Sequence, residues 1–357
     1  MYESSALESV HTTTLPEVLR QLGISVLVST YQAGKLVVVR ADGDAANTHF
    51  RNFNSPMGLA FDRGRLAVGT KTGIEVFLDQ PAAAARLEPA GRHDALYLPA
   101  WSKVTGYIAV HELEYARGEL WAVNTRFSCL CTFDDHHSFV PRWRPSFVTA
   151  LAPEDRCHLN GLAVVDGAPR YVTALGATDR NADWRADKAR GGVLMDVPSG
   201  EFVARGLSMP HSPRWYRGKL WVCESGTGTL ATVDLATGKR DVVAEMPGFT
   251  RGLDFCGNLA FVGLSQVRET ALSSGIPITE RLPVEERACG MWVVDIDRGQ
   301  TVAFLRFDAG VQEVFAVRVL PGVRFPELLN EDGSDAIENS FVLPDDALKD
   351  APGAVRV

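Results

Sequence analysis

The sequence contains no apolar run long enough to span a bilayer and no excess of positive charge. A transmembrane helix needs about 20 predominantly apolar residues. The formal net charge of −8 offers no electrostatic attraction to nucleic acid or to an anionic membrane. The segment from Met1 to Thr14 also lacks the basic and apolar regions of a signal peptide. We therefore expect a cytoplasmic protein whose partners include neither nucleic acid nor a membrane.

Cysteine is scarce, and the six cysteines show no Cys-x-x-Cys spacing that would indicate a zinc or redox site. Cys129 and Cys131 lie two apart on a predicted strand, where their side chains share a face. They could contact a metal, but we expect two small apolar core residues. No zinc-protease, kinase or nucleotide-binding fingerprint occurs, so no nucleotide cofactor is expected. Ser225 lies in a strand–turn–strand context and is interpreted as a hairpin residue rather than a hydrolase nucleophile.

What the sequence does contain is a repeated phrase, in which one residue precedes a short apolar run. After Met57, for example, comes Gly58–Phe61, then a glycine and a second apolar run at Leu66–Val68. Repeats of about 40–50 residues that hold several short strands are typical of propellers. The six residues that begin the phrases, which we call the column, are Met57, His111, Asn160, His211, Arg251 and Glu313.

These repeats predict an all-β protein, a single six-bladed β-propeller over residues 26–320. The last blade has an inner strand near 313–320 but no partners after it, whereas apolar strands occur at Val26–Thr30 and Lys35–Arg40. The N-terminal strands are therefore expected to close the last blade. Residues 1–25 are predicted to be an N-terminal extension with a short helix over Leu15–Leu22. Residues 321–357 are predicted to be a C-terminal surface extension. Five or seven blades, two packed sheets and an α/β fold are the alternatives, and the last two conflict with the absence of long amphipathic helices.

In a propeller the column, the turns between second and third strands, and long insertions at 177–191 and 266–289 would surround one funnel. Ligand sites favour such concave openings with a few convergent polar groups. A small-molecule substrate is therefore the expected partner, and the sequence leaves the oligomeric state open. The residues expected to contact the substrate are Tyr31, Asn124, Arg126, Asp179, Trp184, Glu224 and Arg251.

The column also suggests a metal site. His111, Asn160, His211 and Glu313 would converge from four blades, and imidazole ligands suit Zn, Fe, Mn or Cu. Glu112 could supply an additional oxygen ligand, or orient the His111 ring by a hydrogen bond to it. The alternative is a polar lining whose members bond to each other and to trapped water.

Without a metal, the same residues could perform acid–base chemistry. His111 or His211 beside Glu112 or Glu313 would form such a pair, because a carboxylate fixes the tautomer of an imidazole. The catalytic set would then be His111, Glu112, His211 and Arg251.

Two further residues each have two interpretations. Arg251 could bind a substrate carboxylate or phosphate through its planar guanidinium, or form an internal salt bridge to Glu313 or Asp254. His158 lies two residues before Asn160 and could share its side of an extended segment. We expect His158 to be a loop histidine bonded to backbone rather than a ligand.

Several segments resemble a bacterial family of propeller-like proteins of unknown function, over residues 26–320. The resemblance implies a propeller and supplies no established activity. A weaker likeness, of architecture only, is to six-bladed lactonases, paraoxonase-like hydrolases and strictosidine-synthase-like enzymes. That likeness implies Glu, Asn and Asp metal ligands, or a catalytic Glu, near the axis, and here histidines replace some of these oxygen ligands. The segments that carry the family resemblance are Val110–Leu113, Leu120–Thr125, Cys157–Leu162, Tyr171–Gly176 and Met209–Trp215.

Together these features lead us to expect a metal-assisted, hydrolase-like enzyme that acts on a small polar or anionic metabolite in the funnel. Metal-bound water would attack the substrate, because coordination brings its pKa near neutrality. The alternatives are a metal-free lyase, isomerase or cyclase, and a propeller that binds or scaffolds without chemistry.

Overall fold

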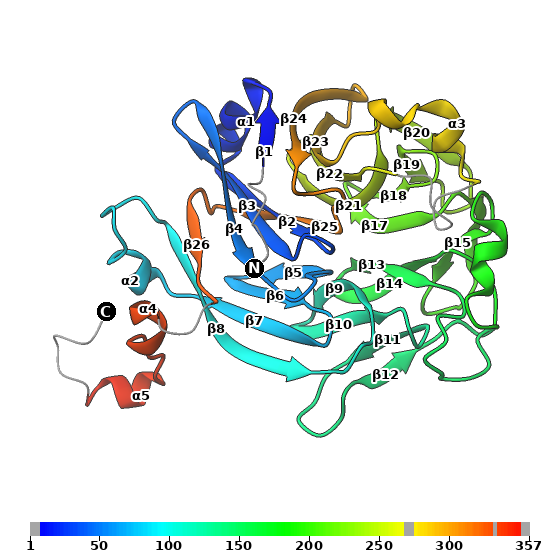
Figure 1. The fold of residues 1–357 in the computed structure, drawn as a ribbon. Helices are drawn as coiled ribbons and strands as arrows, with labels where there is room; N and C mark the ends of the chain where they lie inside the picture. The colour runs from blue at the N-terminus through cyan, green and yellow to red at the C-terminus, as the bar shows by residue number, and fades with distance from the viewer. Residues whose placement is uncertain (1–7, 268–274, 331–333, 351–357) are drawn as a thin grey trace, which may run out of the picture.

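The computed structural model describes residues 8–267, 275–330 and 334–350, and these form six β-sheets set around a common axis (Figure 1). The expected all-β, six-bladed propeller is confirmed. Residues 268–274 of the insertion expected at 266–289 lie outside the described residues. No helix in the described part of the chain is long and apolar enough to cross a membrane.

Blades 1 to 5 each contain four consecutive antiparallel strands, counted outward from the axis. Blade 1 consists of β5 (Leu59–Asp62), β6 (Arg65–Gly69), β7 (Gly73–Asp79) and β8 (Ala95–Val104). Blade 2 consists of β9 (Val110–Ala116), β10 (Glu119–Asn124), β11 (Cys129–Thr132) and β12 (Val140–Trp143). Blade 3 consists of β13 (Leu159–Val165), β14 (Ala168–Ala174), β15 (Gly192–Asp196) and β16 (Phe202–Leu207).

The remaining blades complete the ring. Blade 4 consists of β17 (Pro210–Tyr216), β18 (Lys219–Glu224), β19 (Thr229–Val233) and β20 (Arg240–Glu245). Blade 5 consists of β21 (Phe249–Cys256), β22 (Leu259–Ser265), β23 (Gly290–Asp295) and β24 (Gln300–Ala309). Blade 6 takes its inner strand, β25 (Ala316–Pro321), from the end of the ring and β2 (Ile24–Thr30), β3 (Lys35–Asp42) and β4 (Ala45–Asn52) from its beginning. The predicted closure by N-terminal strands is therefore confirmed, with Ser29 opposite Ala316.

Both terminal extensions also contribute strands to blades. β1 (Glu8–His11) pairs with β24 as a fifth strand of blade 5, and the predicted N-terminal helix is present as α1 (Thr14–Leu22). β26 (Pro326–Leu328) lies parallel to β8 as a fifth strand of blade 1. The segment after 321 is therefore in part a sheet strand, whereas the sequence suggests only a surface extension. The short helices are α2 (Pro81–Ala84), η1 (Asp183–Asp187), α3 (Pro277–Arg281), η2 (Val284–Glu286), α4 (Asp335–Glu338) and α5 (Asp345–Leu348).

Glu327 of β26 holds the C-terminal segment to blade 6. Its carboxylate lies 2.9 Å from Nη2 of Arg51 and 2.8 Å from Nε2 of His49, both on β4. Arg40 of β3 donates to the backbone carbonyl of Pro326. Burial raises the pKa of Glu327, but His49 and Arg51 outweigh it and lower this pKa to about 2.

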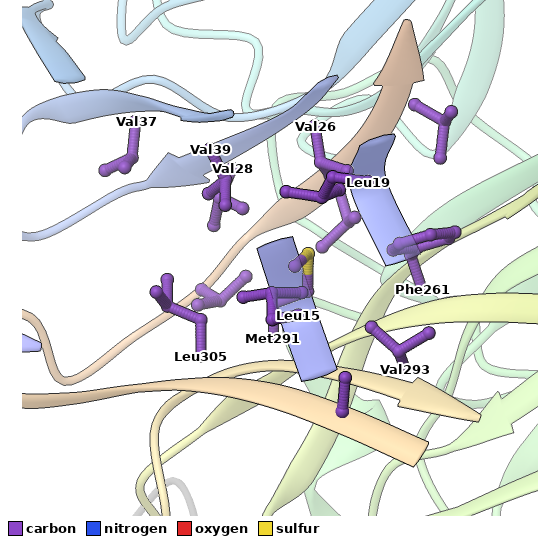
Figure 2. Close-up of a cluster of buried hydrophobic side chains, with 14 of the residues drawn as sticks. Leu15, Leu19, Val26, Val28, Val37, Val39, Phe261, Met291, Val293 and Leu305 are labelled. Carbon is purple, nitrogen blue, oxygen red and sulfur yellow. The ribbon is translucent and has the colours of Figure 1, made fainter. Parts of the chain in front are cut away.

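The hydrophobic core consists of layers between neighbouring blades, because strands such as β2 are buried on both faces. Six clusters of buried side chains each join two adjacent blades around the ring. Between blades 5 and 6, α1 inserts Leu15 and Leu19 among the valines of β2 and β3 and the side chains of β22 to β24 (Figure 2). Cys129 and Cys131 lie in the layer between blades 1 and 2, which confirms them as core residues.

Glycine follows the column residue in the odd-numbered blades, where neighbouring inner strands approach most closely. A Cβ on Gly58 would lie 2.9 Å from the backbone of Glu112 and Leu113 in blade 2. A Cβ on Gly252 would lie 2.6 Å from the backbone nitrogen of Val317 in blade 6. Gly58 and Gly252 therefore allow the backbones of neighbouring inner strands to pack directly against each other.

Further along the inner strands, Arg214 on β17 joins four blades at the axis. Its guanidinium donates to both carboxylate oxygens of Glu112 on β9, at 3.0 and 3.1 Å. It also donates to the backbone carbonyls of Leu253 on β21 and Leu162 on β13. Burial raises the pKa of Glu112 while the Arg214 charge lowers it. These are the charge-assisted, bidentate contacts that make a buried charge tolerable.

Arg318 on β25 extends this network to the other two blades. It donates to the carboxylate of Glu114 on β9 and to the carbonyl of Leu59 on β5. Its second nitrogen lies 3.7 Å from Asp254 on β21. The two arginines together therefore contact every blade, and we call these five charged side chains the axial network: Glu112, Glu114, Arg214, Asp254 and Arg318.

Candidate functional site

A cavity of about 570 Å³ opens where the inner strands begin, on the side of the axis that the column occupies. Its walls also include the first insertion, through Trp184 of η1, and the turn residues Tyr31 and Arg126. This volume is typical of sites that enclose a small molecule. Five of the six column residues line it: Met57, His111, His211, Arg251 and Glu313.

Local irregularities in the inner strands place these side chains. Between His211 and Arg214 the register of β17 with β18 shifts by one residue, and Ser212 within this shift has φ 50°. The pairing of β21 with β22 shifts in the same way around Arg251. A β-bulge adds one residue, bends the strand and re-aims a side chain. The bulges therefore explain how side chains on an inner strand turn into the funnel rather than into a blade face.

His111 and His211 are held in the same tautomer by the same local geometry. Nδ1 of His111 lies 3.1 Å from the carbonyl of Ala109, and Nδ1 of His211 lies 2.9 Å from the carbonyl of Met209. A carbonyl only accepts, so each Nδ1 carries the proton and each Nε2 has a lone pair. Among the residues that the structure describes, neither Nε2 atom has a hydrogen-bond partner.

Both imidazoles are neutral at pH 7. Desolvation lowers the pKa of His111 well below its ordinary value, and the charges of His158 and Arg251 lower it further. Desolvation and Arg251 do the same to the pKa of His211. Each can therefore accept a proton at Nε2 from a group bound in the cavity.

Ser225 is not a nucleophile in this arrangement. Its hydroxyl donates to the carbonyl of Thr250 and lies 2.9 Å from Nδ1 of His211, on the side of the ring away from Nε2. Ser225 is buried and is not among the residues that line the cavity. It supports the orientation of the His211 ring, which agrees with its interpretation as a turn residue.

Arg251 is one of the cationic groups of the cavity wall. Its side chain is only 12% exposed, and one nitrogen, Nη1, donates to Glu313 at 3.3 Å. The guanidinium lies 3.4 Å from the ring centre of Phe315. The other terminal nitrogen, Nη2, is buried and has no hydrogen-bond partner among the described residues. Desolvation lowers the pKa of Arg251 to about 10, although Glu313 opposes this.

Sequence reasoning missed the role of His158 in this cavity. Nδ1 of His158 lies 2.9 Å from the carboxylate of Asp155, which also accepts the indole N–H of Trp184 at 3.1 Å. The rings of His158 and His111 meet edge to face, with centres 4.8 Å apart. The sequence suggested that His158 bonds to the backbone, but its partner in the structure is the carboxylate of Asp155. The signal that could have found the pair is the spacing of Asp155 and His158, which are three residues apart in one turn.

Other residues expected in the site lie outside the cavity lining. Glu112 is in the axial network and does not face His111. Asn160 accepts from the hydroxyl of Thr173, and Asn124 accepts from the backbone of Phe127. Asp179 accepts from Thr149 and Arg156, and Glu224 accepts from the backbone of Ser208. Each of these four side chains thus accepts a hydrogen bond from a neighbouring strand or loop.

Three of the four residues expected to bind a metal line the cavity. His111, His211 and Glu313 line the cavity, but Asn160 does not, and Glu313 faces the positive charge of Arg251. Within 8–267, 275–330 and 334–350, no group of three or more histidine, cysteine, aspartate or glutamate side chains is placed to hold a metal ion. The metal stays a prediction, and elemental analysis is its test.

Comparisons with known proteins add no activity. A crystal structure of a protein of unknown function from Bacteroides caccae is similar over 83% of this chain and 98% of that chain, with 10% identity and a TM-score of 0.51. The structure of a nidogen/laminin complex is similar over 84% of this chain and 99% of the matched chain, with 11% identity and a TM-score of 0.49. No curated protein matches the chain.

One family model matches most of the sequence. It is described as Domain of unknown function (DUF4915) and covers residues 13–329, a range that includes α1, all six blades and β26. The resemblance to a propeller family of unknown function, which the segments around His111, Asn160 and His211 indicate, is thus confirmed. The chain belongs to the family of the Domain of unknown function (DUF4915).

Proposed function

We propose that this protein binds a small metabolite by an anionic group in the funnel cavity and acts on it by histidine acid–base catalysis, as an isomerase or lyase. The observation that carries the proposal is the buried Nη2 of Arg251, which has no partner among the described residues. A desolvated guanidinium with a free donor strongly favours an anion, because the unpaired donor is costly and a carboxylate would satisfy it.

The histidines supply the chemistry. With an anion on Arg251, a neutral His111 or His211 accepts a proton at Nε2 from the substrate carbon or hydroxyl next to that anion. The negative charge that develops is stabilised by the Arg251 guanidinium, which is already in place before the reaction.

A proton must also be returned, and His158 is suited to this. As an imidazolium, His158 would donate Nδ1–H to the Asp155 carboxylate and present Nε2–H as an acid. The two kinds of histidine environment thus divide the roles: the bases are bonded to carbonyls, and the acid is bonded to a carboxylate. This division is the reason that we assign no step to a metal ion.

Anion binding is tested by thermal unfolding with acetate or propionate added. A ligand at 100 times its Kd stabilises the folded state by about 2.7 kcal/mol. We expect this stabilisation in the wild type and in Arg126→Met, whose arginine lines the cavity but donates to backbone carbonyls. We expect none in Arg251→Met, or in Arg251→Met/Glu313→Gln, which avoids leaving Glu313 unpaired. Equal stabilisation of all variants would overturn the proposal.

Catalysis is tested by following carboxylate metabolites in D₂O by NMR. Exchange of the proton next to the carboxylate, or its elimination product, is expected in the wild type and lost in His111→Gln and His211→Gln with the circular dichroism spectrum unchanged. Elemental analysis of the same preparations checks the metal prediction. About one equivalent of Zn, Fe, Mn or Cu that is lost in both variants would replace this proposal by metal-assisted chemistry.

A further inference from the structure

The cavity beside Arg251 is built largely from aromatic rings. Phe315 lies under the guanidinium and meets the ring of His111 edge to face, with centres 5.0 Å apart. Phe249 meets the ring of His211 in the same way at 5.5 Å. Trp184 lies against His158, with centres 4.4 Å apart. A ligand whose anionic end reaches Arg251 therefore lies among several ring faces and edges, beside the Nε2 atoms of the histidines.

Sulfur and aliphatic side chains complete this wall. Met57 and Met209 are buried and line the cavity with Leu175. Methionine adapts to irregular shapes and makes favourable contacts with aromatic rings. An apolar or aromatic body would gain from leaving water here, whereas a polyhydroxylated one would lose hydrogen bonds.

The charges of the cavity lining favour a ligand with a single anionic group. Glu313, Glu154 and Asp155 all line the cavity and repel negative charge. Of the three arginines in the lining, Arg251 is the one with a buried nitrogen that lacks a partner among the described residues. Arg185, at the exposed side, packs over the ring of Trp184. A second carboxylate or a phosphate dianion would therefore find carboxylates and no free buried cation.

From these three observations we infer that the ligand is an aryl or arylalkyl monocarboxylate, with its carboxylate on Arg251 and its ring between Phe249, Phe315 and Trp184. The inference rests on the anion site of the proposed function and narrows it to one substrate class. Aromatic pairs in offset or edge-to-face contact are stabilised beyond the area that they bury.

The test is isothermal titration with four probes that differ in one feature each. 3-Phenylpropionate has both the ring and the carboxylate, propionate lacks the ring, succinate has a second carboxylate in its place, and 3-phenylpropanol lacks the charge. We expect 3-phenylpropionate to bind at least tenfold more tightly than each of the others. Tighter binding of succinate would overturn the inference.

Matched variants locate the ring contact. Phe249→Leu keeps an apolar side chain but removes the ring from the cavity, and we expect it to abolish the advantage of 3-phenylpropionate over propionate. Phe139→Leu is the control, because Phe139 packs on Phe127 and does not line the cavity. An unchanged advantage in Phe249→Leu would contradict the placement of the ring.

The outcomes separate this inference from the proposed function. If no carboxylate binds, the anion site itself is wrong and both fail. If propionate and 3-phenylpropionate bind equally, the substrate class alone is wrong. If 3-phenylpropionate binds through Arg251 and Phe249 but no aryl carboxylate turns over, the class stands and the acid–base function fails.

Discussion

Replacing Arg214 by methionine removes the cation that faces Glu112 and Glu114 at the axis. Methionine retains much of the apolar volume of the side chain, so the change is mainly one of charge and hydrogen bonding. The variant loses both bonds to the Glu112 carboxylate and those to the carbonyls of Leu162 and Leu253. It also loses the contact with Glu114 at 3.5 Å.

The expected loss of stability follows from the buried carboxylates that remain without a cation in this variant. Removing one partner of a buried ion pair costs about 3–5 kcal/mol, because the other charge is left uncompensated. The entropy of unfolding is about 2.1 cal/mol/K per residue, which for 357 residues is roughly 0.75 kcal/mol/K. A loss of about 4 kcal/mol would therefore lower Tm by about 5 °C.

Scanning calorimetry and urea unfolding of the wild type and three variants test this reasoning. Arg214→Met/Glu112→Gln should recover part of the stability that Arg214→Met loses, because no unpaired carboxylate remains at Glu112. Arg298→Met is the control: Arg298 forms an ion pair with Asp295 at 2.8 Å, but its side chain is 72% exposed, so the loss should stay below about 1 kcal/mol. Equal Tm values for Arg214→Met and Arg298→Met would refute the assignment of the axial network as a stabilising element of the ring.

Three further predictions concern other parts of the molecule. Glu327, whose pKa is lowered to about 2, contributes stability that is fully present above its unfolded value of 4.5 and is lost as the pH falls towards 2. Glu327→Gln should therefore lower the free energy of unfolding by about 3 kcal/mol at neutral pH. The urea unfolding midpoint of this variant should also depend less on pH between 4.5 and 2 than that of the wild type. An equal pH dependence in the two proteins would contradict the role of this carboxylate. Gly252→Ala should cost about 3 kcal/mol from strain and overlap, whereas Gly257→Ala, which also has a positive φ but only a 3.7 Å contact to Leu22, should cost about 1 kcal/mol in the same assay. His111 and His211 have lowered pKa values, so the unfolded chain binds protons that the folded chain does not, and the wild type should lose stability as the pH falls below about 6.5. When the pH is lowered from 7.5 to 5.5, the Tm of His211→Gln should fall by less than the Tm of the exposed control His136→Gln.

The repeated phrase predicted the ring because it marks the inner strand of each blade, where packing restricts the choice of residues most. Inner strands face the axis and two neighbouring blades, so their apolar runs and glycines recur in the sequence. Outer strands are partly exposed to water and pair with a neighbouring strand on one edge only, so polar and apolar residues are mixed in their sequences. That is why β8, β12 and the added strands β1 and β26 left no comparable signal.

The column likewise predicted most of the cavity wall, but not the contacts within it. Strand alternation places Glu112 on a different side from His111, and its partner Arg214 comes from a blade 102 residues away in sequence. The pairing of His158 with Asp155 depends on a loop in which His158 has φ 50°. Such contacts depend on loop conformation and on blade order around the axis, neither of which a single repeat encodes.

The way blade 6 is completed also determines the order in which the molecule can assemble during synthesis. β2 leaves the ribosome among the first strands, yet Ser29 and Ala316, opposite each other in the ring, are 287 residues apart. At 5–20 residues per second, roughly 15–60 s pass before β25 is available. In that interval one edge of β2 offers unpaired backbone groups to other chains. Aggregation of the nascent protein, or its capture by a chaperone, is therefore expected to begin at β2, while each of blades 1 to 5 can form its four core strands from consecutive hairpins.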